Sequence, residues 1–258
     1  MQVWQNGRRR LKIERTKKSN VERINALVLA AGLGTRLRPL TNTIPKCLVE
    51  IDGKPMLGRW SETLAKVSNK IIINTHYLHK QVENYIENDL GSPSNIYLEY
   101  EQELEGTAGT LLKVHKTYSE YDTLLLIHAD NLTDANISEF LEAHKKRPNP
   151  CMMTMMLFEC DNPQECGIVE IDEKGILTDF HEKKNNPPGN MANAAIYAID
   201  KSLLKDLAEW GEIRDFSTEV IPKLISQIYT YKTNGYLLDI GTYKNLERAR
   251  HMTEVFES

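Results

Sequence analysis

Short apolar runs alternate with segments of helical periodicity between residues 71 and 144. Three such pairs follow one another along the chain: 71–73 before 78–90, 96–100 before 108–118, and 124–127 before 137–144. Strands that alternate with helices are typical of βαβ units, whose helices cover both faces of a parallel sheet. Because 258 residues suffice for one such domain with a sizeable core, we expect a single-domain, Rossmann-like α/β fold with a mostly parallel sheet.

The second half of the chain changes character. Runs 152–158, 167–171 and 176–181 have strand composition and short connections, and Glu-Lys-Gly at 173–175 indicates a turn. We therefore expect an antiparallel ribbon that extends the sheet.

Residues 1–23 are rich in Arg and Lys, which predicts a solvated, disordered extension before a domain at 24–258. A membrane-surface or nucleic-acid role is the alternative for this extension.

A glycine-bearing loop follows the apolar run 26–30, which we interpret as a buried strand. Gly32 and Gly34 allow a tight turn and a close approach of backbone N–H groups to a ligand. Arg36 and Lys46 add a rigid guanidinium fork and a mobile point charge, both suited to phosphate oxygens. The loop has neither the G-x-x-x-x-G-K-[ST] pattern nor the third glycine of the dinucleotide fingerprint. It predicts a nucleotide-handling enzyme, with a merely structural turn as the alternative.

Six motifs in order resemble the sugar-1-phosphate nucleotidyltransferase family. They are G-x-G-T-R with Pro45-Lys46 and Gly53-Lys-Pro-Met56, Glu105-Gly-Thr-Ala-Gly109, Ala129-Asp130, Phe180-His-Glu-Lys183, Asn193-Ala-Ala-Ile-Tyr197 and Asp239-Ile-Gly-Thr242. The resemblance covers almost the whole chain and implies a fold of the nucleotide-diphospho-sugar transferase type. It implies an enzyme that joins a nucleoside triphosphate and a sugar 1-phosphate to give an NDP-sugar and pyrophosphate.

The resemblance also assigns roles to residues of this chain. Arg36 and Lys46 are the expected catalytic residues. The expected nucleotide-binding residues are Leu29, Ala31, Gly32, Gly34, Thr35, Arg36, Gln102, Gly106 and Thr107. The expected substrate-binding residues are Asp130, Gly167, Glu182, Lys183 and Asn193, with Lys183 on the acceptor phosphate. For Thr107 the alternative is helix capping, for Gln102 plain exposure, and for Lys183 an ordinary surface lysine.

Two aspartates at strand ends are the candidate metal ligands. Asp130 follows the apolar segment 123–129, and Asp239 ends the segment 236–239 ahead of Gly241. Each could instead belong to a helix N-terminus or cap. In the family they hold one divalent cation together, and two carboxylates with phosphate oxygens and water suit Mg²⁺. The sugar phosphate would attack the α-phosphorus in line, and it needs no general base because its phosphate is already ionised.

Departures from the commonest family pattern leave the substrate open. Cys47 stands where proline is usual, Ala129 where glycine is usual, and Asn193 is followed by Ala-Ala rather than Ala-Gly. The likeness is greatest to mannose- or heptose-1-phosphate guanylyltransferases, which favours GTP slightly. Uridylyl, thymidylyl and cytidylyl transfer remain alternatives, as does a non-sugar acceptor such as phosphocholine. A metal-dependent glycosyltransferase and a non-catalytic regulatory relative are rival classes. A glycosyltransferase would not need the charges of Arg36 and Lys46 to hold a triphosphate. A regulatory relative usually lacks a charged residue of the glycine loop or one of the two aspartates.

Composition and charge exclude several partners. A formal net charge of -4 argues against nucleic acid, since such a surface needs a basic excess. The four cysteines have no C-x-x-C spacing, so neither a zinc site nor a disulfide framework is indicated, and the reducing cytoplasm is the expected compartment. No apolar run approaches the roughly 20 residues of a spanning helix, so no membrane contact is expected. The sequence does not indicate an oligomeric state.

Overall fold

The computed structural model describes residues 22–256. The predicted basic extension lies outside the described residues apart from its last two. Of these, Arg23 donates its backbone N–H to Asp122, and Glu22 accepts a hydrogen bond from Thr123.

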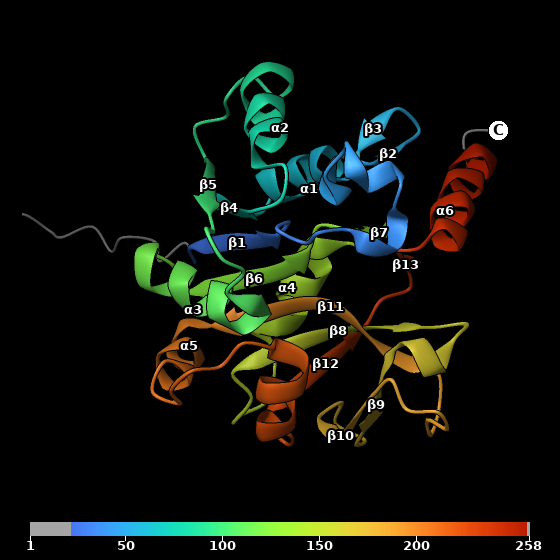
Figure 1. Cartoon of the computed structure of the whole chain (residues 1–258). Helices are drawn as coiled ribbons and strands as arrows, with labels where there is room; N and C mark the ends of the chain where they lie inside the picture. Colours follow the sequence, from blue (N-terminus) through green and yellow to red (C-terminus); the bar gives the residue numbers. More distant parts are fainter. Residues whose placement is uncertain (1–21, 257–258) are drawn as a thin grey trace, which may run out of the picture.

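One large sheet of nine strands organises the molecule. Its strands are β1 (Ile24–Leu29), β4 (Lys70–Thr75), β5 (Ile96–Tyr100), β6 (Thr123–His128), β8 (Met153–Glu159), β9 (Gly167–Ile171), β10 (Leu177–Glu182), β11 (Met191–Asp200) and β12 (Ile228–Lys232). Figure 1 shows them in spatial order, from β5 at the top through β4, β1, β6, β11 and β8 to β12. Strands β6, β1, β4 and β5 are parallel, as the alternation of runs predicts.

Strand β11 joins this parallel half to the rest. It runs antiparallel to β6 on one side and to β8 on the other, and the β9/β10 ribbon continues from its first residues. The expected antiparallel extension is therefore confirmed. Between Asn193 and Tyr197 the register of β11 shifts, and Ala195 adopts a φ of 52°.

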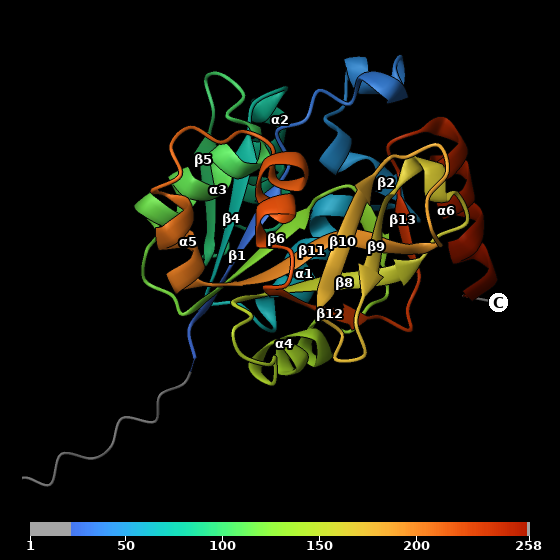
Figure 2. The same ribbon diagram turned by 90° about the horizontal axis from the view of Figure 1, so that it is seen from below.

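Helices cover both faces of the sheet. They are α1 (Met56–Ala65), α2 (His79–Asn84), α3 (Gly106–Thr117), α4 (Ile137–Lys145) and α5 (Lys201–Leu207), whereas α6 (Tyr243–Phe256) belongs to a separate apolar cluster. Alternate residues of β1 pack into two different cores, because successive side chains of a strand point to opposite faces. Leu27 packs on the side of α3 and α5, whereas Ala26 and Val28 pack on the side of α1 and α4. Figure 2 shows α4 on the opposite side of the strands from α3 and α5.

Two short sheets lie beside the carboxyl end of the main one. Strand β7 (Asn131–Thr133) pairs with β13 (Leu237–Asp239), and β2 (Glu50–Ile51) pairs with β3 (Lys54–Pro55). A third apolar cluster, which includes Leu37, Ile51 and Leu246, packs these pieces against α6. The glycine loop and both candidate metal aspartates are thereby brought to one edge of the sheet. Within the described residues, no helix is both long and apolar enough to cross a bilayer.

Candidate active site

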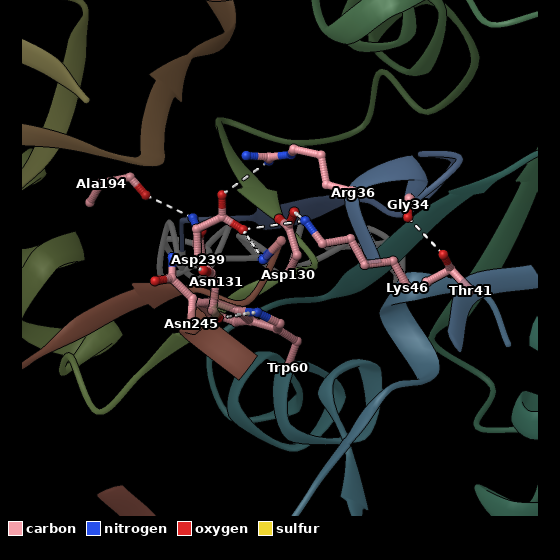
Figure 3. Close-up of polar contacts among 11 residues, drawn as sticks. Gly34, Arg36, Thr41, Lys46, Trp60, Asp130, Asn131, Ala194, Asp239 and Asn245 are labelled. Atoms are coloured by element: carbon pink, nitrogen blue, oxygen red, sulfur yellow. Dashed lines mark hydrogen bonds and ion pairs between the residues drawn. The ribbon is translucent and has the colours of Figure 1, made fainter. Parts of the chain in front are cut away.

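Four charged side chains meet at the carboxyl end of the parallel strands (Figure 3). The Lys46 ammonium contacts the Asp130 carboxylate directly and lies 3.3 Å from Oδ1 of Asp239. Nη2 of Arg36 lies 3.6 Å from Oδ2 of the same Asp239. These residues come from the glycine loop, the end of β6 and the end of β13. The structure therefore unites the two predicted catalytic cations with the two predicted metal ligands.

Backbone pairing fixes the two aspartates relative to one another. Asp239 pairs with Asn131 across the β7/β13 ladder, and the Asp130 carbonyl accepts the Ile240 N–H at 3.0 Å. Oδ1 of Asp239 accepts the Gly241 N–H at 2.7 Å. A Cβ at Gly241 would lie 2.6 Å from Nζ of Lys46 and 2.8 Å from Nη2 of Arg36. A side chain at this position would therefore displace the ends of both cationic side chains from their present places.

Asn131 holds the backbone just after Asp130 in place. Its carbonyl accepts the Trp60 indole N–H at 3.0 Å, and its side chain donates to the Ala194 carbonyl at 2.8 Å. Asn131 and Trp60 are both buried. Helix α1 and strand β11 thus orient the carboxylate through buried hydrogen bonds, which are costly to break.

The glycine loop itself is held by a left-handed residue. Gly34 has a φ of +61°, and a Cβ there would approach Cγ2 of Thr41 to 2.9 Å. Thr41 donates its hydroxyl to the Gly34 carbonyl at 2.7 Å. The turn that follows buries Leu37 completely while Arg36 stays exposed. Leu37 therefore anchors the loop and leaves the guanidinium exposed beside Asp239.

Charge pairing keeps Asp130 ionised. Burial acts to raise the pKa of its carboxyl, but the Lys46 ammonium and His128 outweigh burial, so that pKa lies below its ordinary value. Next to Lys46, burial raises the pKa of the Cys47 thiol to about 12. The cysteine that replaces the usual proline is thus a neutral core residue.

The aspartates fit a divalent cation. Both carboxylates contact one Lys46 ammonium, which is 13% exposed and supplies the positive charge between them. Two carboxylates that converge on one cationic position, with room for phosphate oxygens and water, form the oxygen-rich donor set that Mg²⁺ uses. Asp130 and Asp239 would hold the ion.

A first pocket of about 230 Å³ lies between the glycine loop and the start of α3. Of the predicted nucleotide-binding residues, Leu29, Ala31, Gly32, Gly106 and Thr107 line it. Thr107 does not cap α3; its hydroxyl accepts the Phe216 N–H at 2.8 Å. A Cβ at Gly106, whose φ is +80°, would collide with the Arg214 carbonyl at 2.4 Å.

The polar end of this pocket is Glu101, which the sequence did not single out. Glu101 is 1% exposed, and its Oε1 accepts hydrogen bonds from Nδ2 of Asn74 at 2.9 Å and from the Thr110 hydroxyl at 2.5 Å. Its Oε2 has a longer bond, 3.3 Å, from the Glu105 N–H. The exposed neighbour Gln102 lines neither this pocket nor the next.

A second, larger pocket of about 450 Å³ opens on the β9/β10 side of the charged cluster. The predicted acceptor residues Gly167, Glu182, Lys183 and Asn193 all line it. Nζ of Lys183 lies 3.4 Å from Oε1 of Glu182. A Cβ at Gly167 would lie 2.7 Å from the Phe180 ring and 2.8 Å from the Glu182 carboxylate, so a larger residue would disturb this wall.

Asp130 and His128 line both pockets, so the two cavities meet at the candidate metal site. Of these two pockets, Arg36 and Asp239 line only the second, whereas Gly34 and Thr35 line neither. His128 and Asn131 also line the second pocket, and the sequence analysis assigned neither of them a role. For His128 a signal existed, because it ends the strand that carries Asp130.

The fold and the site together define an α/β protein with a charged cluster at the carboxyl edge of its sheet, between two pockets. Residues 25–254 match the family model described as Nucleotidyl transferase. The chain belongs to this family, and the resemblance to sugar-1-phosphate nucleotidyltransferases is confirmed.

Individual relatives agree with this membership. The chain is 30% identical over 232 residues to a mannose-1-phosphate guanylyltransferase of Mycobacterium tuberculosis, covering 87% of this chain and 63% of the relative. It is 31% identical over 225 residues to the bifunctional protein GlmU of Methanocaldococcus jannaschii, covering 84% and 51%. The chain thus spans between about half and two thirds of these curated relatives.

A solved structure of HddC from Yersinia pseudotuberculosis superposes with a TM-score of 0.75 at 25% identity, covering 89% of this chain and 99% of that one. The same protein has also been solved in complex with GMP-PN. The expected fold of the nucleotide-diphospho-sugar transferase type is confirmed.

Proposed function

We propose that this protein transfers a nucleotidyl group from a nucleoside triphosphate to a sugar 1-phosphate, with release of pyrophosphate, and that its substrates are GTP and mannose or heptose 1-phosphate. One observation carries the proposal: two pockets of different character meet at Asp130, beside Lys46 and Asp239. A reaction that joins two phosphorylated substrates needs this arrangement, because the phosphate of the acceptor must reach the α-phosphorus of the nucleotide.

The first pocket suits a base and ribose. Small backbone segments at Ala31, Gly32 and Gly106 form its walls, so a flat ring can lie against them. The Glu101 carboxylate can only accept hydrogen bonds. Its Oε1 already accepts two, whereas Oε2 accepts one long bond and has a lone pair left for the N1–H or the exocyclic amine of guanine. Pyrimidine bases such as uracil offer a single ring N–H. Glu101 therefore supports guanine as the base.

The cations act on the phosphates. Lys46 and Arg36 would stabilise the charge that develops on the transferred phosphoryl group and on the leaving pyrophosphate. Mg²⁺ held by Asp130 and Asp239 would neutralise phosphate charge there. Lys183 would hold the acceptor phosphate in the second pocket with its oxygen aimed at the α-phosphorus. The acceptor phosphate is already ionised near neutral pH, so no residue need remove a proton.

The names of the relatives support the same substrates. Two kinds of protein converge: a mannose-1-phosphate guanylyltransferase in the curated set, and an HddC structure that contains a guanine nucleotide analogue. The GlmU relatives differ in name from these, so the nucleotide must be measured directly.

The test is a matrix of four nucleoside triphosphates against several sugar 1-phosphates and phosphocholine, scored by pyrophosphate release. We expect release only when both substrates are present, and fastest with GTP and mannose or heptose 1-phosphate. Asp239→Asn serves as the control for contaminating activity. Transfer from an NDP-sugar without pyrophosphate would indicate a glycosyltransferase instead, and no turnover with any pair would favour a regulatory protein.

A further inference from the structure

The β9/β10 ribbon has three side chains of metal-binding type, two carboxylates and one imidazole, on its solvent face. The ladder places Glu170 directly opposite Asp179, and His181 follows two residues after Asp179. Residues two apart on a strand point to the same face, so all three side chains share it. The intervening Phe180 points to the other face, where it packs against the core. Figure 2 shows the two strands of this ribbon side by side.

The three side chains converge on one point. Nε2 of His181 lies 2.8 Å from Oε1 of Glu170 and 3.6 Å from Oδ2 of Asp179. One ligand atom from each residue lies within 4.8 Å of the other two. Zn²⁺ binds His nitrogen and carboxylate oxygen at about 2.0–2.2 Å, which separates neighbouring ligand atoms by roughly 3–3.5 Å. Small side-chain rotations therefore suffice to bring all three onto one ion.

Charge gives this cluster a reason to bind a cation. Like charges directly opposite one another on paired strands are destabilising, and Glu170 and Asp179 form such a pair. A neutral His181 does not compensate two carboxylates, and a protonated one compensates only one of them. A divalent ion balances both and can use the Nε2 lone pair.

We propose that Glu170, Asp179 and His181 form a second metal site, selective for a borderline transition-metal cation such as Zn²⁺ over Mg²⁺. Imidazole nitrogen suits zinc and its neighbours, whereas Mg²⁺ prefers oxygen ligands and retains its waters. The remaining positions would be filled by water, because both carboxylates are exposed. The bound ion would cross-link β9 to β10 just before Glu182 and Lys183. The site is independent of the reaction proposed above.

The test is calorimetric titration of Zn²⁺ into chelator-treated full-length protein, with excess Mg²⁺ present to fill oxygen-only sites. We expect one saturable zinc site in the wild type. His181→Ala and Glu170→Gln should each weaken it by at least about tenfold. His79→Ala is the matched control, because this half-buried histidine stacks on Tyr100 and lies outside the ribbon.

Cobalt provides a second readout. Co²⁺ bound at this site should give a visible absorption band that is lost in His181→Ala and retained in His79→Ala. Thermal unfolding without metal verifies that each variant folds. Equal zinc affinity in wild type and His181→Ala, or the absence of saturable binding to the wild type, would overturn the proposal.

Discussion

The two pockets that meet at Asp130 are built from different kinds of residue. The first is lined by backbone, small residues and buried polar groups such as Glu101 and Asn74, which are already hydrogen-bonded to one another. The second is larger and lined by charged side chains that remain accessible, among them Lys183, whose side chain is 67% exposed. A preformed pocket discriminates by rigid complementarity, whereas exposed charges must be ordered when the ligand binds.

This difference suggests where each specificity resides. Selection of the nucleotide should depend on a few buried groups and should be sensitive to conservative changes. Selection of the acceptor should depend on side chains that can adjust, so single changes there should weaken binding without abolishing it. The charged cluster between the pockets serves both substrates, and its loss should have the largest effect.

The largest effect is expected for Asp130→Asn and Asp239→Asn. Each amide keeps the shape of the carboxylate but loses the charge that would hold the cation, so turnover should fall at least about a thousandfold with the fold intact. Steady-state pyrophosphate release across a Mg²⁺ titration measures this. Near-normal activity of either variant at saturating Mg²⁺ would remove that aspartate from the shared site.

A smaller loss, about a hundredfold in kcat, is expected for Lys46→Ala. The ammonium acts on charge that develops during the reaction, so ground-state binding of both substrates should change less than the rate. Single-turnover kinetics separates the two. If the variant lost only affinity for one substrate, Lys46 would belong to one pocket and not to their junction.

Arg36→Lys tests the geometry of the phosphate contact. If the guanidinium makes a two-point contact, the lysine variant should lose about tenfold in kcat/KM, nearly as much as Arg36→Ala, because an ammonium cannot reproduce the fork. Comparing the two variants with wild type decides the matter. A lysine variant with the wild-type rate would reduce Arg36 to a point charge.

The smallest effect concerns the base. Glu101→Gln should reduce the preference for GTP over UTP by up to about tenfold, because one acceptor oxygen is replaced by a donor. Gln102→Ala, one residue away and exposed, should leave this preference unchanged. The ratio of kcat/KM for the two nucleotides is the measurement, with thermal unfolding as the check on folding. A loss in the Gln102 variant alone would support Gln102, and not Glu101, as the residue that contacts the base.

Local patterns predicted much of the fold. Strand β5 has the expected bounds at 96–100, whereas α3 begins at Gly106, ahead of the expected helical segment 108–118. The long strand β11 was not predicted beyond its motif, since its small alanines and the register shift near Ala195 obscure the alternation. Strand β12, which pairs with β8, was also missed.

The charged residues of the site were predictable because each stands at a strand end or in the glycine loop. Their mutual contacts were not, since Lys46 is separated from Asp239 by 193 residues of chain. Which of Glu101 and Gln102 can line the nucleotide pocket depends on the direction of the side chains after β5. Glu101 points inward and is buried, whereas Gln102 is exposed to solvent. Adjacent polar residues at a strand end give no sequence signal for that direction.

We propose that nucleotide and sugar phosphate occupy separate pockets on either side of Asp130. Calorimetric titration of Lys183→Ala and Glu101→Gln tests it, using a non-reacting GTP analogue and the sugar 1-phosphate separately. We predict that Lys183→Ala loses affinity for the sugar phosphate and keeps its affinity for the nucleotide. Glu101→Gln should lose affinity for the nucleotide and keep its affinity for the sugar phosphate. A Lys183 variant that lost nucleotide affinity while it kept sugar phosphate affinity would contradict the account.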